Sequence, residues 1–218
     1  MQLHLIHEFQ EYRQQKAHSK FVIAILDYGS GNLRSAQRAF ETSGKEVVIT
    51  SDYDLALNAE GLVVPGVGAF SACMQGLIKV RGDQLVWERF VAKRPTLGIC
   101  VGMQILFSRG IEHGEHAGVG MWDATVEKLN APILPHMGWN TVRSAPGSVI
   151  FAGIEDQSFY FVHSYAAKKK VGAMPSFAHH NEDFIAAVED GALTATQFHP
   201  EKSADAGLQL IKNWTQTL

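Results

Sequence analysis

The hydrophobic positions of the chain fall into short continuous runs, separated by turns that contain glycine. Such runs occupy residues 21–26, 47–49, 62–64 and 97–99. A strand that helices cover on both faces is apolar at every position, so runs of this kind indicate a parallel sheet. A helix is predicted after the first run, from the turn at 27–35 to about Ser43. The alternation of strands and helices predicts a doubly wound α/β fold, whose ligands bind at the carboxyl ends of the strands.

The pattern changes between residues 119 and 188 to short strands and turns, with the clearest runs at 160–166 and 184–188. These strands are expected to be antiparallel additions to a mostly parallel sheet. The stretch 109–115 is rich in glycine and charge and predicts a surface loop. At the C-terminus, Leu208, Ile211 and Trp214 fit one face of a helix.

We predict that residues 21–218 form a single domain, because 218 residues with 46% hydrophobic side chains are enough for one core. Residues 1–20 form an N-terminal extension. Its Leu5, Phe9 and Tyr12 have helical spacing, and its glutamates argue against a signal or transit peptide. The extension can be a docked appendage, a loose tail or a consequence of start-site choice, and the sequence does not decide between them.

One short stretch carries candidate chemistry at the end of the run 97–99. Cys100 lies there between Gly98 and Gly102, where a strand gives way to a helical pattern. The unpaired N–H groups at a helix start stabilise both a thiolate and the oxyanion that its attack on a carbonyl produces. Small neighbours are expected to let a substrate approach the sulfur. Gln104, one helical turn further on, is suited to hold a ligand.

A second stretch places His199 and Glu201 two residues apart, with Pro200 between them. In an extended chain these side chains face the same way, so Glu201 can orient His199 while His199 faces a thiol. Nucleophile, base and orienting acid are the three parts of a cysteine-based triad. Taken singly, the first stretch is better explained as a buried cysteine at a strand end, and the second can be a surface turn before a helix that starts near Ser203. The two together indicate catalysis.

Composition excludes several other classes of function. The net charge of −3 is dispersed, so neither nucleic acid nor an anionic membrane surface is an expected partner. No apolar stretch approaches the roughly 18 residues of a membrane helix. Two cysteines give no disulfide framework, as in a reducing cytoplasm, and we interpret Cys73 as a packing residue. His113 and His116 lack further ligands for a metal site. The turn at 27–35 matches no phosphate-binding motif.

The stretch Gly98-Ile99-Cys100-Val101-Gly102-Met103-Gln104, together with His199-Pro200-Glu201, resembles the class I, or triad, glutamine amidotransferases. This resemblance implies a flavodoxin-like sheet flanked by helices. It also implies that Cys100, His199 and Glu201 hydrolyse the side-chain amide of glutamine through a thioester and release ammonia, without a cofactor.

Three further stretches, at 27–35, 65–70 and 135–140, resemble the glutaminase subunits of imidazole glycerol phosphate synthases. The most specific is His136-Met137-Gly138-Trp139-Asn140, and the resemblance runs from about Phe21 to the C-terminus. It implies a heterodimer with a cyclase subunit, a (β/α)8 barrel of histidine biosynthesis. There the ammonia would enter a ribulosyl aminoimidazole nucleotide, giving imidazole glycerol phosphate and an aminoimidazole carboxamide ribotide.

The same resemblance assigns roles by motif. It implies that the backbone amides of Val67 and Val101 form the oxyanion hole. It implies glutamine binding by Gly66, Gly68, Gln104, Ser164 and Tyr165, and contact with the partner by Tyr160, Trp139 and Asn140. For Trp139 and Tyr160, core packing is an equally good interpretation. His136 and His163 are alternative bases, but neither has an acid two residues further on.

Two segments depart from the family pattern. Residues 108–114 lack its acidic run, and residues 118–124 replace its usual Gly-Leu-Gly-Leu-Ile-Pro-Gly. Other functions stay open, namely a glutaminase for another acceptor, such as a nucleotide sugar, or a catalytically degenerate regulatory subunit. A stand-alone cysteine peptidase is less favoured, because no feature marks a peptide groove. The glycines of the loop 65–68 lead to one more hypothesis, that the oxyanion hole is incomplete until the partner and its nucleotide bind.

Overall fold

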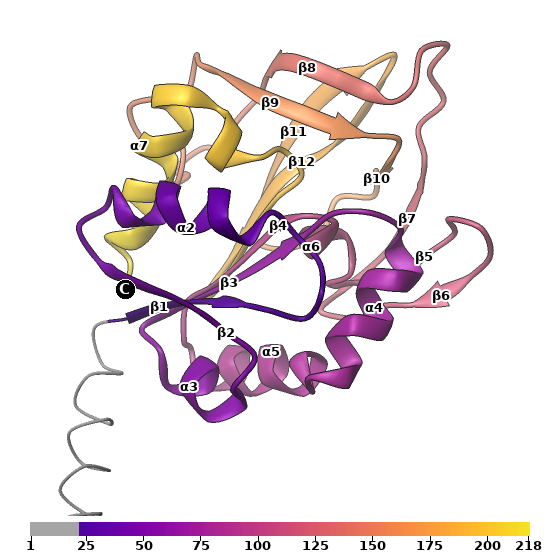
Figure 1. The fold of residues 1–218 in the computed structure, drawn as a ribbon. Coiled ribbons are helices and arrows are strands. Elements are labelled where there is room, and N and C mark those ends of the chain that lie inside the picture. Colours follow the sequence, from indigo (N-terminus) through magenta and orange to yellow (C-terminus); the bar gives the residue numbers. More distant parts are fainter. Residues whose placement is uncertain (1–21) are drawn as a thin grey trace, which may run out of the picture.

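A computed structural model describes residues 22–218, and the predicted N-terminal extension lies outside them. A seven-stranded sheet forms the centre of the molecule, in the order β11-β12-β13-β4-β3-β1-β2 (Figure 1). Its parallel part comprises β1 (Val22–Leu26), β2 (Glu46–Thr50), β3 (Gly61–Gly66), β4 (Thr96–Cys100) and β13 (Leu193–Thr196). The antiparallel strands β11 (Met174–His180) and β12 (Glu182–Asp190) extend it at one edge. The predicted mostly parallel α/β fold is confirmed.

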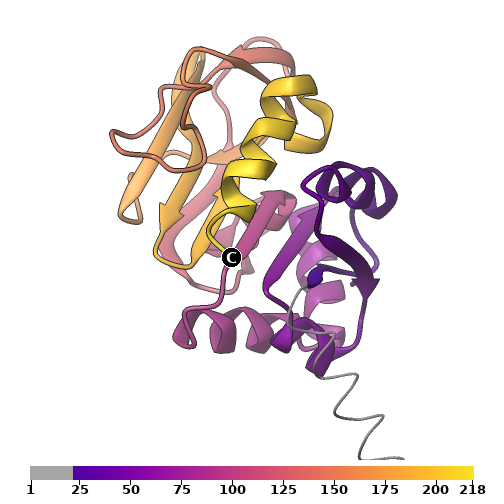
Figure 2. The same ribbon diagram turned by 90° about the vertical axis from the view of Figure 1, so that its left-hand side faces the viewer.

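Helices cover both faces of the parallel strands, which explains why β1 and β4 are buried at every position. On one side lie α2 (Leu33–Glu41) and α7 (Ala204–Thr215), and on the other lie α3 (Tyr53–Asn58), α4 (Phe70–Lys79) and α5 (Gly82–Val91) (Figures 1 and 2). Two short helices remain, α6 (Val101–Gln104) and the 3₁₀ helix η2 (Pro200–Lys202). The C-terminal helix α7 buries Ile211 and Trp214 as its spacing predicts, while Leu208 is only partly buried.

Two smaller sheets are built from the segment between β4 and β11. One has the order β10-β7-β5-β6, from β5 (Phe107–Gly110), β6 (His116–Ala117), β7 (Trp122–Lys128) and β10 (Tyr165–Ala167). The other pairs β8 (His136–Thr141) with β9 (Ser158–His163).

Two local predictions for this segment are wrong in part. The run 160–166 is not one strand: it breaks at Ser164, because β9 pairs with β8 whereas β10 pairs with β7 in a different sheet. The stretch 109–115 is not wholly a loop, since Arg109 and Gly110 belong to β5 and pair with β6 and β7. Pairing between distant strands decides both outcomes, and periodicity does not report it.

Arg89 joins the helical layer to the sheet from inside the protein. The side chain lies on α5 with no exposed surface and donates to the carbonyl groups at the end of α3 and before β4. Its carbonyl partners are Ala56, Leu57, Ala59, Glu60 and Pro95, at 2.7 to 3.2 Å. Burial, and to a smaller extent the charge of Arg94, lower the pKa of the guanidinium to about 9. A buried charge is tolerated here because its donors are matched with acceptors.

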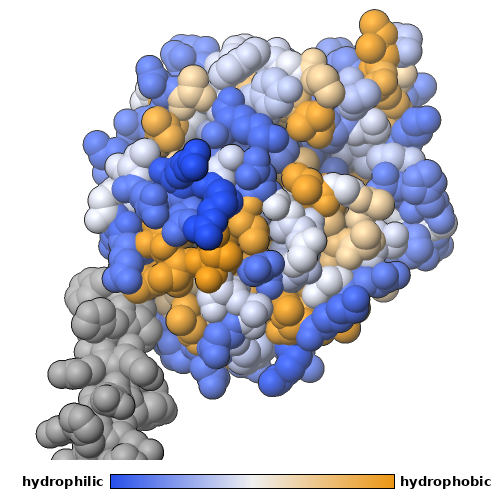
Figure 3. Space-filling view, viewed as in Figure 1, coloured by the Kyte–Doolittle hydropathy of each residue, from blue (hydrophilic) through white to orange (hydrophobic). Residues whose placement is uncertain are grey.

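The face of the molecule in Figure 3 is largely hydrophilic, with separate apolar patches rather than one apolar surface. Exposed apolar side chains nevertheless gather on and before β8, where Met137 is 62% exposed and Trp139 is 56% exposed. Within residues 22–218, no helix is long and apolar enough to cross a membrane.

Candidate active site

Cys100 occupies a strained turn at the carboxyl end of β4. Its φ of 57° and ψ of −115° lie outside the regions that non-glycine residues prefer, and the next residue begins α6. Such a conformation costs about 1–3 kcal/mol and recurs at functional sites, the nucleophile elbow among them. It turns the side chain of Cys100 out of the strand, to the edge where ligands bind in doubly wound folds.

The glycines around Cys100 have a packing role in addition to the access to the sulfur that the sequence predicts. A Cβ on Gly102 would lie 1.9 Å from the carbonyl oxygen of Val64, and a Cβ on Gly66 would lie 2.3 Å from the Gly102 nitrogen. A Cβ on Gly98 would lie 2.9 Å from the Gly102 carbonyl oxygen. The backbone of the elbow is thus pressed against β3 and against itself, which holds Cys100 in its turn.

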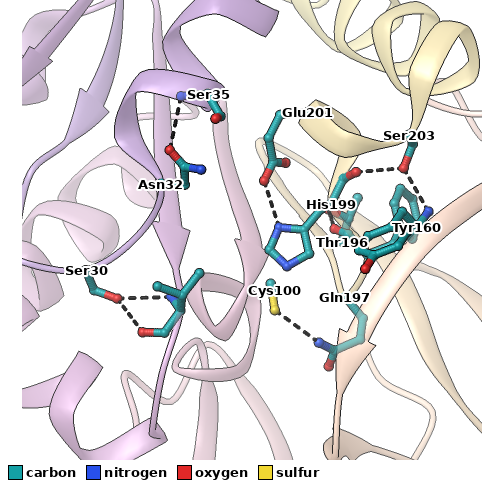
Figure 4. A network of polar contacts seen from close by, with 12 residues as sticks. Ser30, Asn32, Ser35, Cys100, Tyr160, Thr196, Gln197, His199, Glu201 and Ser203 are labelled. Carbon is teal, nitrogen blue, oxygen red and sulfur yellow. Dashed lines mark hydrogen bonds and ion pairs between the residues drawn. The ribbon is translucent and has the colours of Figure 1, made fainter. Parts of the chain in front are cut away.

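His199 and Glu201 meet beside Cys100, as Figure 4 shows. His199 Nδ1 lies 2.7 Å from Glu201 Oε1, and both side chains are at most 5% exposed. The sequence predicts this contact from an extended chain, and that reason is wrong, because Glu201 lies in the 3₁₀ helix η2. Pro200 starts that helix, and Ser203 Oγ donates to the His199 carbonyl at 2.6 Å, which closes the turn.

The surroundings of His199 favour its protonated form. Burial opposes a charged imidazole, but the proximity of Cys100 and Glu201 outweighs it and raises the pKa of His199 to about 9. His199 Nε2 is buried and makes no hydrogen bond to the described residues, and the ring faces Cys100 in Figure 4. The imidazole is therefore protonated at neutral pH.

The Ser30 side chain holds the backbone of the loop after β3 through two hydrogen bonds to Val67. Val67 N–H donates to Ser30 Oγ at 3.0 Å, and Ser30 Oγ donates to the Val67 carbonyl at 2.8 Å. The Val67 amide, which the family resemblance assigns to the oxyanion hole, is therefore engaged by the Ser30 side chain. Gly68 follows with a φ of +96°, a conformation that a glycine adopts without strain.

Tyr28 and Cys73 also contact the segment around Val67. The Tyr28 hydroxyl donates to the Pro65 carbonyl, and Cys73 Sγ lies 3.1 Å from Ser30 Oγ and 3.4 Å from the Val67 carbonyl oxygen. Burial raises the pKa of Tyr28 well above its ordinary value and raises that of Cys73, so both groups keep their protons at neutral pH. The interpretation of Cys73 as a packing residue is incomplete, since its sulfur also contacts the loop.

Of the residues assigned to glutamine binding, Gln104 and Tyr165 are in contact. Gln104 Nε2 donates to the Tyr165 carbonyl at 2.8 Å and to Gln197 Oε1 at 3.0 Å. Both amide protons of Gln104 are thus used in bonds within the protein. The Ser164 carbonyl instead accepts from Leu129 N–H at 2.9 Å.

Comparison with known proteins places this geometry in a family. The family model "Glutamine amidotransferase class-I" matches residues 24–216. The chain belongs to the class-I glutamine amidotransferases. Proteins named "Imidazole glycerol phosphate synthase subunit HisH" are similar to it. The one from Mycolicibacterium paratuberculosis is 57% identical over 201 residues, which are 90% of this chain and 98% of that protein. The one from Streptomyces avermitilis is 56% identical over 207 residues, 90% and 96% of the two chains.

Solved structures agree on the amidotransferase fold. A structure described as a glutamine amidotransferase matches 88% of this chain and 98% of its own, with a TM-score of 0.68 and 18% identity. A structure of PurLQS from Thermotoga maritima matches 91% of this chain and 99% of its own, with a TM-score of 0.67 and 18% identity. At this level of identity the likeness concerns the fold alone.

The two alternative bases of this amidotransferase bond to each other instead of to Cys100. His136 Nδ1 lies 3.0 Å from His163 Nε2, and His163 Nδ1 lies 3.0 Å from the Tyr165 carbonyl oxygen. Burial, together with the nearby histidines, lowers the pKa of His136 to about 4 and that of His163 to about 3. Both imidazoles are therefore neutral near pH 7.

The residues assigned to the partner face differ in exposure. Trp139 is 56% exposed, which excludes core packing for it, while Tyr160 is partly buried against it at a ring distance of 6.1 Å. Asn140 turns inward, since its Nδ2 lies 3.2 Å from His136 Nε2 and donates to the His179 carbonyl at 2.9 Å. Tyr160 also borders the triad, because its carbonyl accepts from His199 N–H at 3.0 Å.

Sequence reasoning missed two residues of this amidotransferase site, Ser30 and Gln197. Both lie in stretches that carry the resemblance, but no local pattern separates them from their neighbours. A hydroxyl in the turn after the first strand, and an amide two residues before His199, are the signals that could have found them. Among residues 22–218, no group of three histidine, cysteine, aspartate or glutamate side chains could hold a metal.

Proposed function

We propose that this amidotransferase hydrolyses glutamine to glutamate and ammonia with a triad of Cys100, His199 and Glu201. The observation that carries the proposal is the convergence of Cys100, on its strained elbow, with the buried His199–Glu201 pair from a distant part of the chain. Similarity to the HisH subunits over nine-tenths of the chain supports the same function.

In the proposed mechanism, Cys100 Sγ attacks the carbonyl carbon of the glutamine side chain. His199, protonated because of its raised pKa, gives its proton to the nitrogen as ammonia leaves, and a thioester forms at Cys100. The neutral imidazole then takes a proton from water, whose oxygen attacks the thioester. Glutamate departs and the proton returns to the Cys100–His199 pair. Glu201 keeps Nε2 of His199 directed at the reaction by bonding Nδ1.

The oxyanion hole of this proposal would consist of the amides of Val67 and Val101. The bond between Val67 N–H and Ser30 supports the hypothesis that the hole is incomplete in the free subunit. Completion requires the peptide that contains Val67 to turn, and a partner that favours the turned state would switch on hydrolysis only when the ammonia can be used. The glutamine itself would be held by Gly66, Gly68, Gln104, Ser164 and Tyr165.

We further propose that the partner is the cyclase subunit of an imidazole glycerol phosphate synthase, a (β/α)8 barrel, in a cytoplasmic heterodimer. The name of the relatives, as subunits of that synthase, supports a partner subunit. The two buried free cysteines fit a reducing compartment. The exposed Met137 and Trp139 provide an apolar docking surface next to Tyr160 and the triad, and ammonia would leave on that side.

The test is glutamine hydrolysis by the purified protein, alone and with a cyclase barrel plus its nucleotide ligand, with Cys100→Ala beside each. We expect little activity alone and a large, Cys100-dependent rise in the mixture. A free protein that hydrolyses glutamine at the rate of the mixture would contradict the switched oxyanion hole. No hydrolysis in either sample, with a barrel shown to bind, would contradict the triad.

A further inference from the structure

Gln197 lies two residues before His199, with a side chain that is almost fully buried in the site. Gln197 directly follows β13, which ends at Thr196. The backbone N–H of Gln197 donates to the Ala186 carbonyl at 2.8 Å. The side chain is only 1% exposed, and its Nε2 lies 3.8 Å from Cys100 Sγ (Figure 4). Backbone pairing with β12 therefore fixes where this amide sits, in contact with the nucleophile.

The neighbouring hydrogen bonds determine which end of the Gln197 amide faces the sulfur. The Tyr165 carbonyl can only accept, so the Gln104 atom 2.8 Å from it must be the NH₂ group. The second proton of that NH₂ group goes to Gln197, 3.0 Å away, whose nearer atom must then be its oxygen. The remaining end of the Gln197 amide, the NH₂ group, is left facing Cys100 Sγ.

The same Tyr165 carbonyl also determines which groups donate and which accept in a second chain of hydrogen bonds. His163 must donate to it through Nδ1, so His163 Nε2 accepts from His136 Nδ1, and His136 Nε2 accepts from Asn140 at 3.2 Å. The lowered pKa values of both histidines keep the run uncharged at neutral pH. The Tyr165 carbonyl oxygen has two lone pairs and accepts from both His163 and Gln104, so the orientation of Gln197 stays determined.

We propose that Gln197 is an auxiliary catalytic residue whose side-chain N–H stabilises the thiolate of Cys100, and that Gln104 is the residue that orients it. A hydrogen bond to the charged form of a group favours that form, and a buried amide has no water to compete with it. In the reaction the thiolate pair of electrons forms the bond to the glutamine carbonyl carbon. The N–H of Gln197 then faces an uncharged thioester sulfur, while the proton for ammonia comes from His199.

The role of Gln197 is testable on the purified protein without glutamine or a partner, so its failure is distinct from failure of the proposed function. Gln197→Glu keeps the acceptor for Gln104 and replaces the N–H by a carboxylate oxygen, and Gln197→Leu removes both polar ends. The readout is the rate of Cys100 alkylation by iodoacetamide against pH, followed by peptide mass spectrometry. The absorbance of the thiolate, measured in a Cys73→Ser background, gives the same profile without a reagent.

We expect alkylation of Cys100 at neutral pH to slow about tenfold in Gln197→Leu and more in Gln197→Glu, with the midpoint of the profile moved to higher pH. His199, Tyr28 and Cys73 are the other titratable groups near the sulfur, and the variants leave them in place. Thiolate absorbance should rise at correspondingly higher pH. Profiles that coincide with that of the unaltered protein, or that move to lower pH, would overturn the proposal.

Two controls separate this effect from a loosened fold. Gln157→Glu makes the same chemical change at an exposed position and should leave the profile unchanged. Buried Cys73 is a reference within each sample: its alkylation would rise if a variant opened the core, whereas a direct effect of Gln197 leaves it constant. Slower Cys100 alkylation together with faster Cys73 alkylation would therefore count against a specific role.

Discussion

Removal of the Ser30 hydroxyl tests whether that side chain keeps the oxyanion hole incomplete in the free subunit. Ser30 Oγ makes two hydrogen bonds to the peptide of Val67, one accepted from its N–H and one donated to its carbonyl. A net contribution of about 0.5–1.5 kcal/mol for each gives about 1–3 kcal/mol in favour of the observed peptide orientation. Ser30→Ala should multiply the population of the turned state by about 5 to 150.

Water can replace part of what the hydroxyl supplies, because Ser30 is only partly buried. We therefore expect the lower end of this range, a rise of about fivefold in glutamine hydrolysis by the free subunit. The rate of the complex should change little, since the partner already favours the turned state. The assay is glutamate production with and without the cyclase barrel, and Ser30→Thr, which keeps a hydroxyl, is the matched control.

Two outcomes would refute this reasoning. A free Ser30→Ala subunit with unchanged or reduced hydrolysis, and a normal rate in the complex, would mean that the Ser30 bonds do not oppose the active orientation. Equal loss of both rates would mean that Ser30 takes part in the reaction itself. Cys73→Ala should have a smaller effect of the same sign, because its sulfur contacts the same carbonyl at the longer distance of 3.4 Å.

Three further predictions concern the triad, the buried histidines and the buried arginine. Glu201→Gln removes the charge that supports the imidazolium of His199, and should lower glutamine turnover at least tenfold while unfolding by urea stays two-state. The pKa of His136 falls from 6.5 to about 4 on folding, so the unfolded chain binds more protons below pH 6.5, and stability from this group is lost as pH falls from 6.5 toward 4. Between about pH 7 and 5.5 the loss is about 1 kcal/mol, and urea unfolding should show a shallower pH slope for His136→Asn; an unchanged slope would contradict the assignment. Arg89→Met leaves five carbonyl groups without their donor, so it should lower the free energy of unfolding by about 3–5 kcal/mol, measured by urea denaturation, whereas a loss below 1 kcal/mol would show that water satisfies them.

Local sequence patterns were enough to predict the layered fold and the location of the chemistry. Continuous apolar runs report strands buried on both faces, since helices on either side leave no room for polar positions. Cys100 follows such a run directly, and the carboxyl ends of parallel strands share one edge, so its place at that edge follows from local pattern and topology. The requirements of a cysteine-based triad and the family resemblance were enough to predict that the distant His199 and Glu201 act together with Cys100.

The orientation of these groups, in contrast, depends on contacts between distant parts of the chain. Ser30 and Val67 are 37 residues apart, and Gln104 and Gln197 are 93 residues apart. Whether an amide faces a hydroxyl, a sulfur or an empty oxyanion hole depends on such long-range bonds, which leave no periodic trace. The same holds for Trp139, exposed on β8, and His136, buried three residues earlier. Local sequence determines which element a residue joins, whereas the packing of distant elements determines which polar partner it meets.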